Sequence, residues 1–194
     1  TIQASKESDA LIAEICPDIA VCDDCLMELY TNDRRKGYPL INCTNCGPRF
    51  TIMEDFPYDR INTSMHEFKM CMACREEYAD PGDRRFHAQP ISCPDCGPQY
   101  SYHLNGTVEN RFPVLIKTLA REIDKGKIAA IKGLGGYNLT CDALNEKAVA
   151  EMRAFKKRER KPFAVMFKSL EILKSYCSVS PAEENILTSW RRPI

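Results

Sequence analysis

The sequence lacks the features that would draw a chain to a polyanion or into a bilayer. Its 194 residues include 27 Lys and Arg against 27 Asp and Glu, so no net charge favours nucleic acid or a membrane surface. No apolar run approaches the ~20 residues of a membrane span, and no secretory leader opens the sequence. We therefore expect a cytoplasmic protein, in a reducing compartment where thiols persist.

Cysteine, in contrast, is abundant, and eight of the 11 cysteines form four Cys-x2-Cys pairs. The gap between the first and second pairs is nearly as long as the gap between the third and fourth. Such spacing is typical of zinc sites in which four thiolates bind one Zn²⁺ tetrahedrally. We predict two structural zinc ions, one held by Cys22, Cys25, Cys43 and Cys46 and the other by Cys71, Cys74, Cys93 and Cys96. A reducing compartment disfavours a disulfide framework, and an interleaved pairing of the motifs stays open.

The two predicted zinc sites form an internal repeat with a period of about 50 residues. Arg34-Arg35 recurs as Arg84-Arg85, and each second cysteine pair is followed by Gly-Pro, where we expect the glycine to adopt a positive φ. Each copy is poor in apolar residues, so zinc should contribute on the order of 10 kcal/mol of folding free energy per site. Chelation is therefore expected to unfold this half of the chain.

Alternating helix and strand patterns follow the cysteine-rich half. The periodicity predicts helices over 114–125, ended by Gly126, over 145–157, with Asn145 as N-cap, and over 169–177 and 182–190. It predicts strands over 128–131, 138–141 and 163–167. Strand and helix in alternation are typical of an α/β domain.

We therefore predict an α+β protein overall, in which two small four-cysteine zinc modules precede an incomplete α/β domain. The expected boundaries are a linker over 1–18, zinc modules over 19–60 and 61–98, a turn-rich linker over 99–112 that contains Asn105-Gly106, and a truncated α/β domain over 113–194.

Two segments of the second half could bind a phosphate group. The loop Lys132-Gly133-Leu134-Gly135-Gly136-Tyr137 could let a backbone approach a ligand closely, but it matches neither a Walker loop nor a dinucleotide fingerprint, and a plain tight turn explains it equally well. The basic stretch 156–161 could clamp phosphates through Lys156, Arg158 and Lys161, or could simply be a solvated helix end.

Longer strings in the sequence carry a family resemblance. The segments 41–52 (INCTNCGPRFTI), 57–60 (PYDR) and 83–90 (DRRFHAQP) resemble the zinc-finger region of HypF, the family of hydrogenase-maturation carbamoyltransferases. The segments 132–143 (KGLGGYNLTCDA) and 156–166 (KKRERKPFAVM) resemble the first part of a YrdC-like domain. Together these regions span nearly the whole chain.

The resemblance implies an enzyme that forms carbamoyl adenylate from carbamoyl phosphate and ATP and passes the carbamoyl group to the C-terminal cysteine of its partner HypE. It implies that Lys156 and Arg158 hold nucleotide phosphates and that the loop around Tyr137 lines the same cavity. The present chain alone is expected to turn over little or nothing. The alternative is a non-catalytic finger module that binds protein or RNA, which the absence of a basic stripe interleaved with aromatic residues disfavours.

Overall fold

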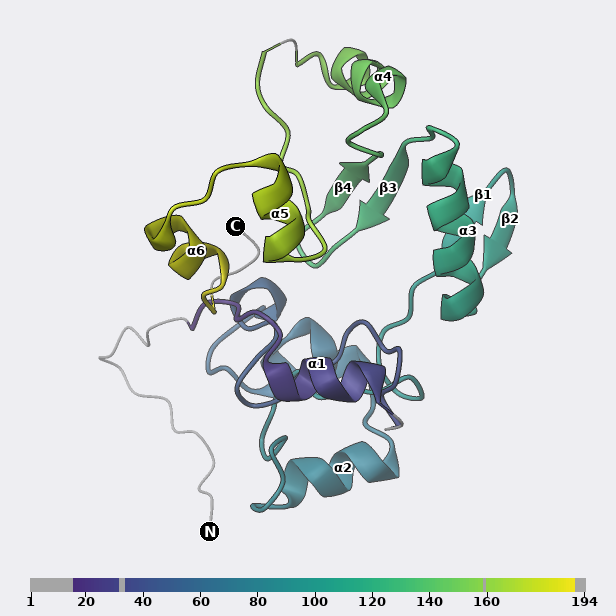
Figure 1. The fold of residues 1–194 in the computed structure, drawn as a ribbon. Helices are drawn as coiled ribbons and strands as arrows, with labels where there is room; N and C mark the ends of the chain where they lie inside the picture. Colours follow the sequence, from purple (N-terminus) through teal and green to yellow (C-terminus); the bar gives the residue numbers. More distant parts are fainter. Residues whose placement is uncertain (1–15, 32–33, 159, 191–194) are drawn as a thin grey trace. The chain divides into compact units, whose positions relative to one another are not determined.

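The computed structural model describes residues 16–31, 34–158 and 160–190. The chain divides into two compact units (Figure 1). The first, called the finger unit, comprises the described residues up to Pro98 together with those from Ile186 onward. The second unit runs from Gln99 to Asn185. Residues 1–15 of the linker expected over 1–18 lie outside the described residues. None of the described helices is both long and apolar enough to span a bilayer.

Two short α-helices stand at equivalent places of the repeat in the finger unit: α1 (Asp23–Tyr30) and α2 (Met72–Ala79). Each begins directly after the first cysteine of its module, Cys22 or Cys71. The remaining elements are the 3-10 turns η1 (Phe50–Ile52), η2 (Arg60–Asn62) and η3 (Ser64–Glu67). So little regular structure is consistent with a chain segment that is ordered by its ligand clusters instead of a broad apolar core.

The buried apolar clusters of the finger unit are small and centred on cysteine. One consists of Cys25, Tyr38, Ile41, Cys43 and Cys46, and the other of Cys74, Ala88, Ile91 and Cys93. Because thiols make up about half of each cluster, folding without a bound metal would leave these modules with a core too small to offset the loss of chain entropy.

The second unit starts with a β-hairpin, β1 (Tyr102–Leu104) and β2 (Thr107–Glu109), that the sequence did not predict. Asn105 and Gly106 form its turn with φ angles of 49° and 80°, the conformation that favours Asn-Gly in two-residue hairpins. The turn-rich linker predicted over 99–112 is therefore partly a hairpin. Strands this short do not show a clear two-residue periodicity.

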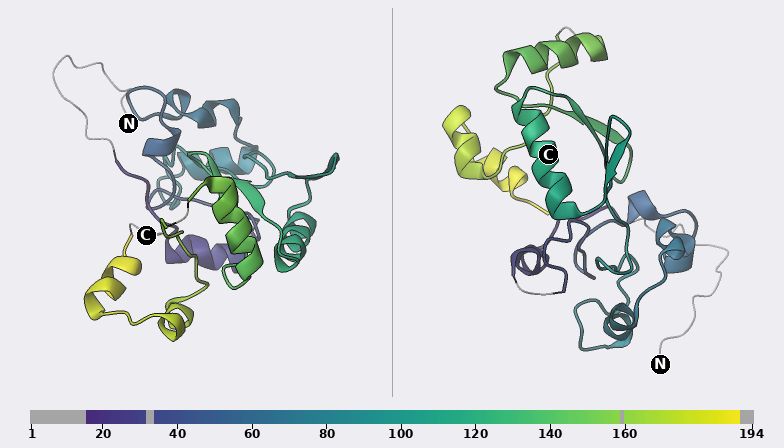
Figure 2. Two further views of the ribbon diagram at one scale, coloured as in Figure 1. Left: turned by 90° about the horizontal axis from the view of Figure 1, so that it is seen from above. Right: turned by 90° about the vertical axis from the view of Figure 1, so that its right-hand side faces the viewer.

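The helix predicted after the hairpin is confirmed as α3 (Phe112–Asp124). Pro113 lies in its first turn, and Gly126 follows its end with φ at 81°. The helix packs against β2 (Figures 1 and 2). Strands β3 (Ala129–Lys132) and β4 (Tyr137–Thr140) then form a two-stranded antiparallel sheet in which Lys132 pairs with Tyr137.

Three further helices follow close to their predicted positions: α4 (Glu146–Lys156), α5 (Leu170–Tyr176) and α6 (Pro181–Leu187). The Asn145 side chain caps α4 by accepting the backbone N–H of Ala148 at 3.0 Å, as its N-cap assignment requires. Two separate architectures, cysteine-centred modules and a mixed helix and strand unit, agree with the predicted α+β class.

The strand predicted over 163–167 was wrong. This segment is irregular, with Val165 52% exposed and Met166 89% exposed. A strand needs a partner for its backbone hydrogen bonds. Within 160–190, as in the rest of the described chain, no strand pairs with this segment, so its β-forming composition alone does not make it a strand.

Candidate metal centres and the basic loop

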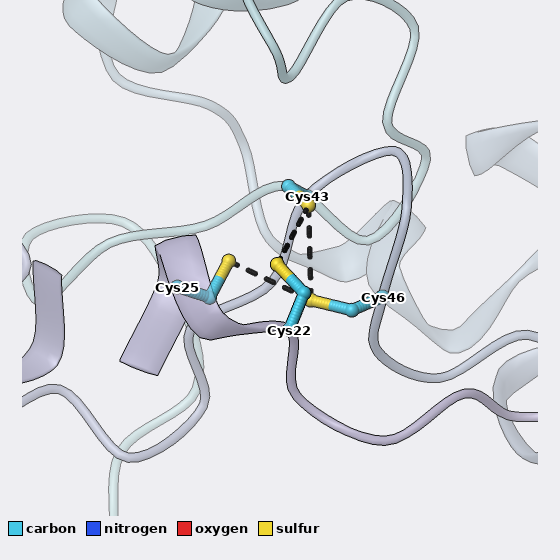
Figure 3. A group of neighbouring side chains, drawn as sticks. All are labelled: Cys22, Cys25, Cys43 and Cys46. Atoms are coloured by element: carbon cyan, nitrogen blue, oxygen red, sulfur yellow. Dashed lines mark hydrogen bonds between the residues drawn. The ribbon is translucent and has the colours of Figure 1, made fainter. Parts of the chain in front are cut away.

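Four thiols converge in the first finger module (Figure 3). Sulfur-to-sulfur distances are 3.7 Å for Cys22–Cys43, 3.7 Å for Cys43–Cys46 and 3.5 Å for Cys25–Cys46, and all four sulfurs lie within 4.8 Å of one another. A disulfide would require ~2.05 Å. Four sulfurs placed tetrahedrally at ~2.3 Å from a zinc ion would be ~3.8 Å apart. The cluster therefore has the dimensions of a zinc site.

The second module repeats this arrangement. Its sulfurs are 3.8 Å apart in Cys71–Cys93, 3.7 Å in Cys93–Cys96 and 3.6 Å in Cys74–Cys96. The structure thus brings the eight predicted ligands together as two sets, pairing adjacent motifs along the chain and leaving all 11 cysteines free of disulfides. Cys16, Cys141 and Cys177 belong to neither set.

The turns that present the cysteines need glycine for two different reasons. Gly47 has φ at 102°, as predicted, and a Cβ there would also lie 2.6 Å from the Cβ of Asn42. Gly97 is not in the left-handed region, so the predicted positive φ was wrong at this position. A Cβ at Gly97 would instead lie 2.2 Å from the Tyr38 hydroxyl oxygen, because a side chain of the first module fills that space.

The repeated arginine pairs join the two modules reciprocally. Arg35, 1% exposed, donates from Nε to the carbonyl of Ser92 at 2.8 Å and binds Glu77 of α2 with its two terminal nitrogens. The equivalent Arg85 donates from Nε to the carbonyl of Asn42 at 3.1 Å and binds Glu28 of α1. Each buried guanidinium thus crosses to the other module's helix.

The neighbouring arginines reach the same helices and the thiol clusters. Arg34 donates to Glu77 at 2.7 Å and to the sulfur of Cys74 at 3.2 Å. Arg84 donates to Glu28 at 2.8 Å and to the sulfur of Cys25 at 3.1 Å. These four arginines are therefore engaged in contacts within the protein.

The pKa of Glu77 reflects this environment. Burial opposes its ionisation, yet hydrogen bonds from Arg35 and Arg34 outweigh burial and lower the pKa to about 2. Glu77 is therefore a permanent anion in the middle of the contact between modules at neutral pH. Sequence reasoning found the arginine repeat but not its partners, which belong to the other copy of the repeat.

The residues predicted to bind nucleotide lie on two segments of the second unit. Lys132, Gly133, Gly135, Gly136 and Tyr137 form the β3–β4 turn and the strand ends beside it, and the Gly133 N–H donates to the Gly136 carbonyl at 2.7 Å. Lys156 ends α4, and Arg158 and Lys161 follow it. Among the described residues, no hydrogen bond or ion pair joins the turn 132–137 to the basic residues 156–158 and 160–161. The Gly133–Gly136 hydrogen bond is what a plain tight turn requires.

Arg153 on α4 organises the basic stretch, and sequence reasoning did not identify it. Its guanidinium donates to the carbonyls of Arg158 at 3.3 Å and Lys161 at 3.1 Å and lies 4.8 Å from the ring centre of Phe163. A hollow of about 500 Å³ here is lined by Arg153, Ala154, Lys157 and Arg160. These residues could attract an anion at this end of α4.

Comparison with protein families matches both halves of the chain. Residues 21–53 and 70–103 match the family described as HypF finger, which coincides with the two thiol clusters. Residues 121–194 match the Sua5/YciO/YrdC family, described as telomere recombination. The clusters and the finger match together support zinc binding.

Individual relatives are similar over almost the whole chain. The carbamoyltransferase HypF of Rhodobacter capsulatus is 49% identical over 181 residues, 93% of this chain and 24% of the relative. HypF2 of Cupriavidus necator is 46% identical over 197 residues, 100% of this chain and 24% of the relative. Among solved structures, HypF of T. kodakarensis has 56% identity and a TM-score of 0.87, with 92% of this chain and 24% of that chain covered.

A second solved structure, a full-length HypF in its phosphate- and nucleotide-bound form, has 54% identity and a TM-score of 0.85 over 93% of this chain and 24% of that one. The fold and the thiol clusters thus define a double four-cysteine finger followed by YrdC-like sequence. The chain belongs to the HypF family of carbamoyltransferases. It spans about a quarter of the length of the relatives it matches.

Proposed function

We propose that this chain is the finger region and the first part of the YrdC-like domain of a carbamoyltransferase that acts in NiFe-hydrogenase maturation. The enzyme uses carbamoyl phosphate and ATP to form carbamoyl adenylate and transfers the carbamoyl group to the C-terminal cysteine thiol of HypE. The observation that carries the proposal is 44–49% identity to five HypF carbamoyltransferases over at least 91% of the chain. A reactive acceptor thiol suits the reducing cytoplasm.

In this proposal the zinc ions are structural. Four thiolates fill the coordination shell of each ion and leave no open position for a substrate. Zinc would bind Cys22, Cys25, Cys43 and Cys46 in one module and Cys71, Cys74, Cys93 and Cys96 in the other, and would supply folding free energy to modules whose cores are small. Mass spectrometry under native conditions should show two zinc ions per chain.

The nucleotide would be held by the basic stretch and the glycine-rich turn, namely by Lys156, Arg158, Lys161 and the segment Lys132–Tyr137. Adenylate formation is a displacement at a phosphorus of ATP, and fixed cations stabilise the charge that develops there. The support is the YrdC-family match, the nucleotide bound by a HypF relative, and the cluster of cations at the end of α4.

The test is ATP binding by the full-length enzyme that contains this chain, measured by calorimetry. We expect Lys156→Ala combined with Arg158→Ala to weaken ATP binding by tenfold or more. Lys147→Ala is the matched control, because Lys147 is an exposed lysine on the same helix. Unaltered affinity in the double variant would remove these residues from the site.

A further inference from the structure

The two finger modules contact one another through their metal-site residues, not only through their surfaces. On α1, Cys25 and Glu28 are three residues apart and so share a helix face. Cys74 and Glu77 do the same on α2. Each of these faces receives the arginine pair of the other module, so an arginine contacts a thiol that belongs to the repeat copy it is not part of.

The thiols that receive these contacts are among the five ligand cysteines that are fully buried. Cys25 and Cys74 are both 0% exposed, so water cannot solvate their sulfurs. A zinc centre with four thiolates has a formal charge of roughly −2, which is costly to bury without hydrogen-bond donors or opposite charge. A guanidinium supplies both, since it is always protonated and carries several N–H groups in a fixed plane.

The geometry holds both arginines in place for this role. The Arg34 side chain is 29% exposed and the Arg84 side chain is 26% exposed, and each is anchored by a carboxylate, Glu77 or Glu28, one turn along from the thiol. Their N-to-S distances, 3.2 Å and 3.1 Å, are nearly equal although the two contacts come from different copies of the repeat. Because the same contact occurs in both copies of the repeat, we take it to be a regular part of the fold.

We propose that Arg34 and Arg84 are positioning residues for zinc that act across the repeat: Arg34 stabilises zinc in the Cys71, Cys74, Cys93 and Cys96 cluster, and Arg84 stabilises zinc in the Cys22, Cys25, Cys43 and Cys46 cluster. The inference rests on the proposed zinc ligands and is independent of the carbamoyl-transfer reaction. Groups that hydrogen-bond to metal ligands typically change metal affinity by about 10- to 100-fold when they are removed.

The test measures the loss of zinc from each of the two clusters separately, starting from the zinc-loaded chain. Protein is exposed to increasing EDTA, thiols that lose their metal are alkylated, and peptide mass spectrometry gives the half-release concentration of each cluster. Zinc counted in the untreated wild type tests the ligand assignment by itself. We expect Arg34→Met to shift the ratio of the two half-release concentrations about tenfold toward loss from the second cluster, and Arg84→Met to shift it about tenfold the other way.

Controls separate positioning from general destabilisation. Arg75→Met removes an exposed arginine next to Cys74 in the sequence and should leave the ratio at its wild-type value. Arg34→Lys keeps the charge and should recover part of the shift. A variant that only loosens the fold lowers both half-release concentrations together, which leaves the ratio unchanged and overturns the inference. The inference is also overturned if the ratio shifts toward zinc loss from the cluster of the module that contains the substituted arginine. If the untreated wild type holds no zinc, the assignment of the cysteines as zinc ligands is overturned as well.

Discussion

The buried Arg35–Glu77 pair between the finger modules gives the sharpest test of what holds them together. Replacing Arg35 with Met keeps much of the side-chain length and removes the charge. The variant loses two hydrogen bonds to Glu77, one to the carbonyl of Ser92 and a longer one, 3.5 Å, to the sulfur of Cys74. The last two are buried. Glu77 then keeps Arg34 as its remaining arginine partner.

The magnitude follows from these contacts. Leaving the Ser92 carbonyl unpaired costs about 1–3 kcal/mol, and removing one partner of a buried ion pair costs about 3–5 kcal/mol in total. The lower half of that range applies here, because Glu77 is 21% exposed and stays paired with Arg34. We therefore expect Arg35→Met to destabilise the zinc-loaded finger unit by about 3–4 kcal/mol, a large part of the ~5–15 kcal/mol typical of a folded domain.

The assay is urea unfolding with free zinc buffered, followed by the fluorescence of Trp190. This residue is the only tryptophan of the sequence and belongs to the finger unit. Arg75→Met, on an exposed position of α2, should change the free energy of unfolding by no more than about 0.5 kcal/mol, as is usual for surface substitutions. The double variant Arg35→Met/Glu77→Met should recover little of the loss, because the Ser92 carbonyl stays unpaired and Arg34 loses its carboxylate partner as well. A loss below about 1 kcal/mol in Arg35→Met, or one equal to that of Arg75→Met, would refute the reasoning.

Three further predictions concern the finger unit. Removing zinc with a chelator should abolish the circular-dichroism signal of α1 and α2, since the thiol-centred cores are small; retention of both helices would contradict a structural role for the metal. Gly97→Ala should cost about 1–3 kcal/mol in urea unfolding, because its Cβ would lie 2.2 Å from the Tyr38 hydroxyl, whereas Gly82→Ala, 3.3 Å from the end of the Asp80 side chain, should cost less. The folded pKa of Glu77, about 2, is below its ordinary 4.5, so its ion pairs contribute fully above pH 4.5 and lose their effect as the pH falls toward 2. The difference in unfolding free energy between wild type and Glu77→Gln should therefore narrow as the pH falls from 6 through 4.5, over the range in which native mass spectrometry still finds both zinc ions bound. A constant difference over that range would show that the carboxylate charge is not what stabilises the contact.

Local signals in the sequence predicted the features that depend on local physics. Cys-x2-Cys spacing predicted both thiol clusters, because a two-residue separation already brings two sulfurs to one turn. Asn145 and Gly126 predicted the start of α4 and the end of α3, because capping involves only neighbouring backbone groups. The confirmed parts of the fold are those in which a few consecutive residues determine the geometry.

The features that were missed depend on partners far away in the chain. The segment 163–167 has the composition of a strand, but a strand forms only where another backbone completes its hydrogen bonds. Analogy within the repeat predicts for Gly97 the conformation of Gly47, whereas the actual constraint on Gly97 is the Tyr38 side chain, which belongs to the other module. Repeat symmetry therefore predicted which residues matter without predicting what they touch.

The reciprocal arginine contacts explain why the repeat has two copies in one unit. An isolated first module would leave Glu28 without Arg84 and Arg85 and would expose its own Arg34 and Arg35 without their acceptors. Each module thus lacks the cations for its own helix face and supplies those of the other. Each half of this exchange therefore needs residues of both modules, and a change in the arginine pair of one module is expected to act on the helix face and thiol cluster of the other.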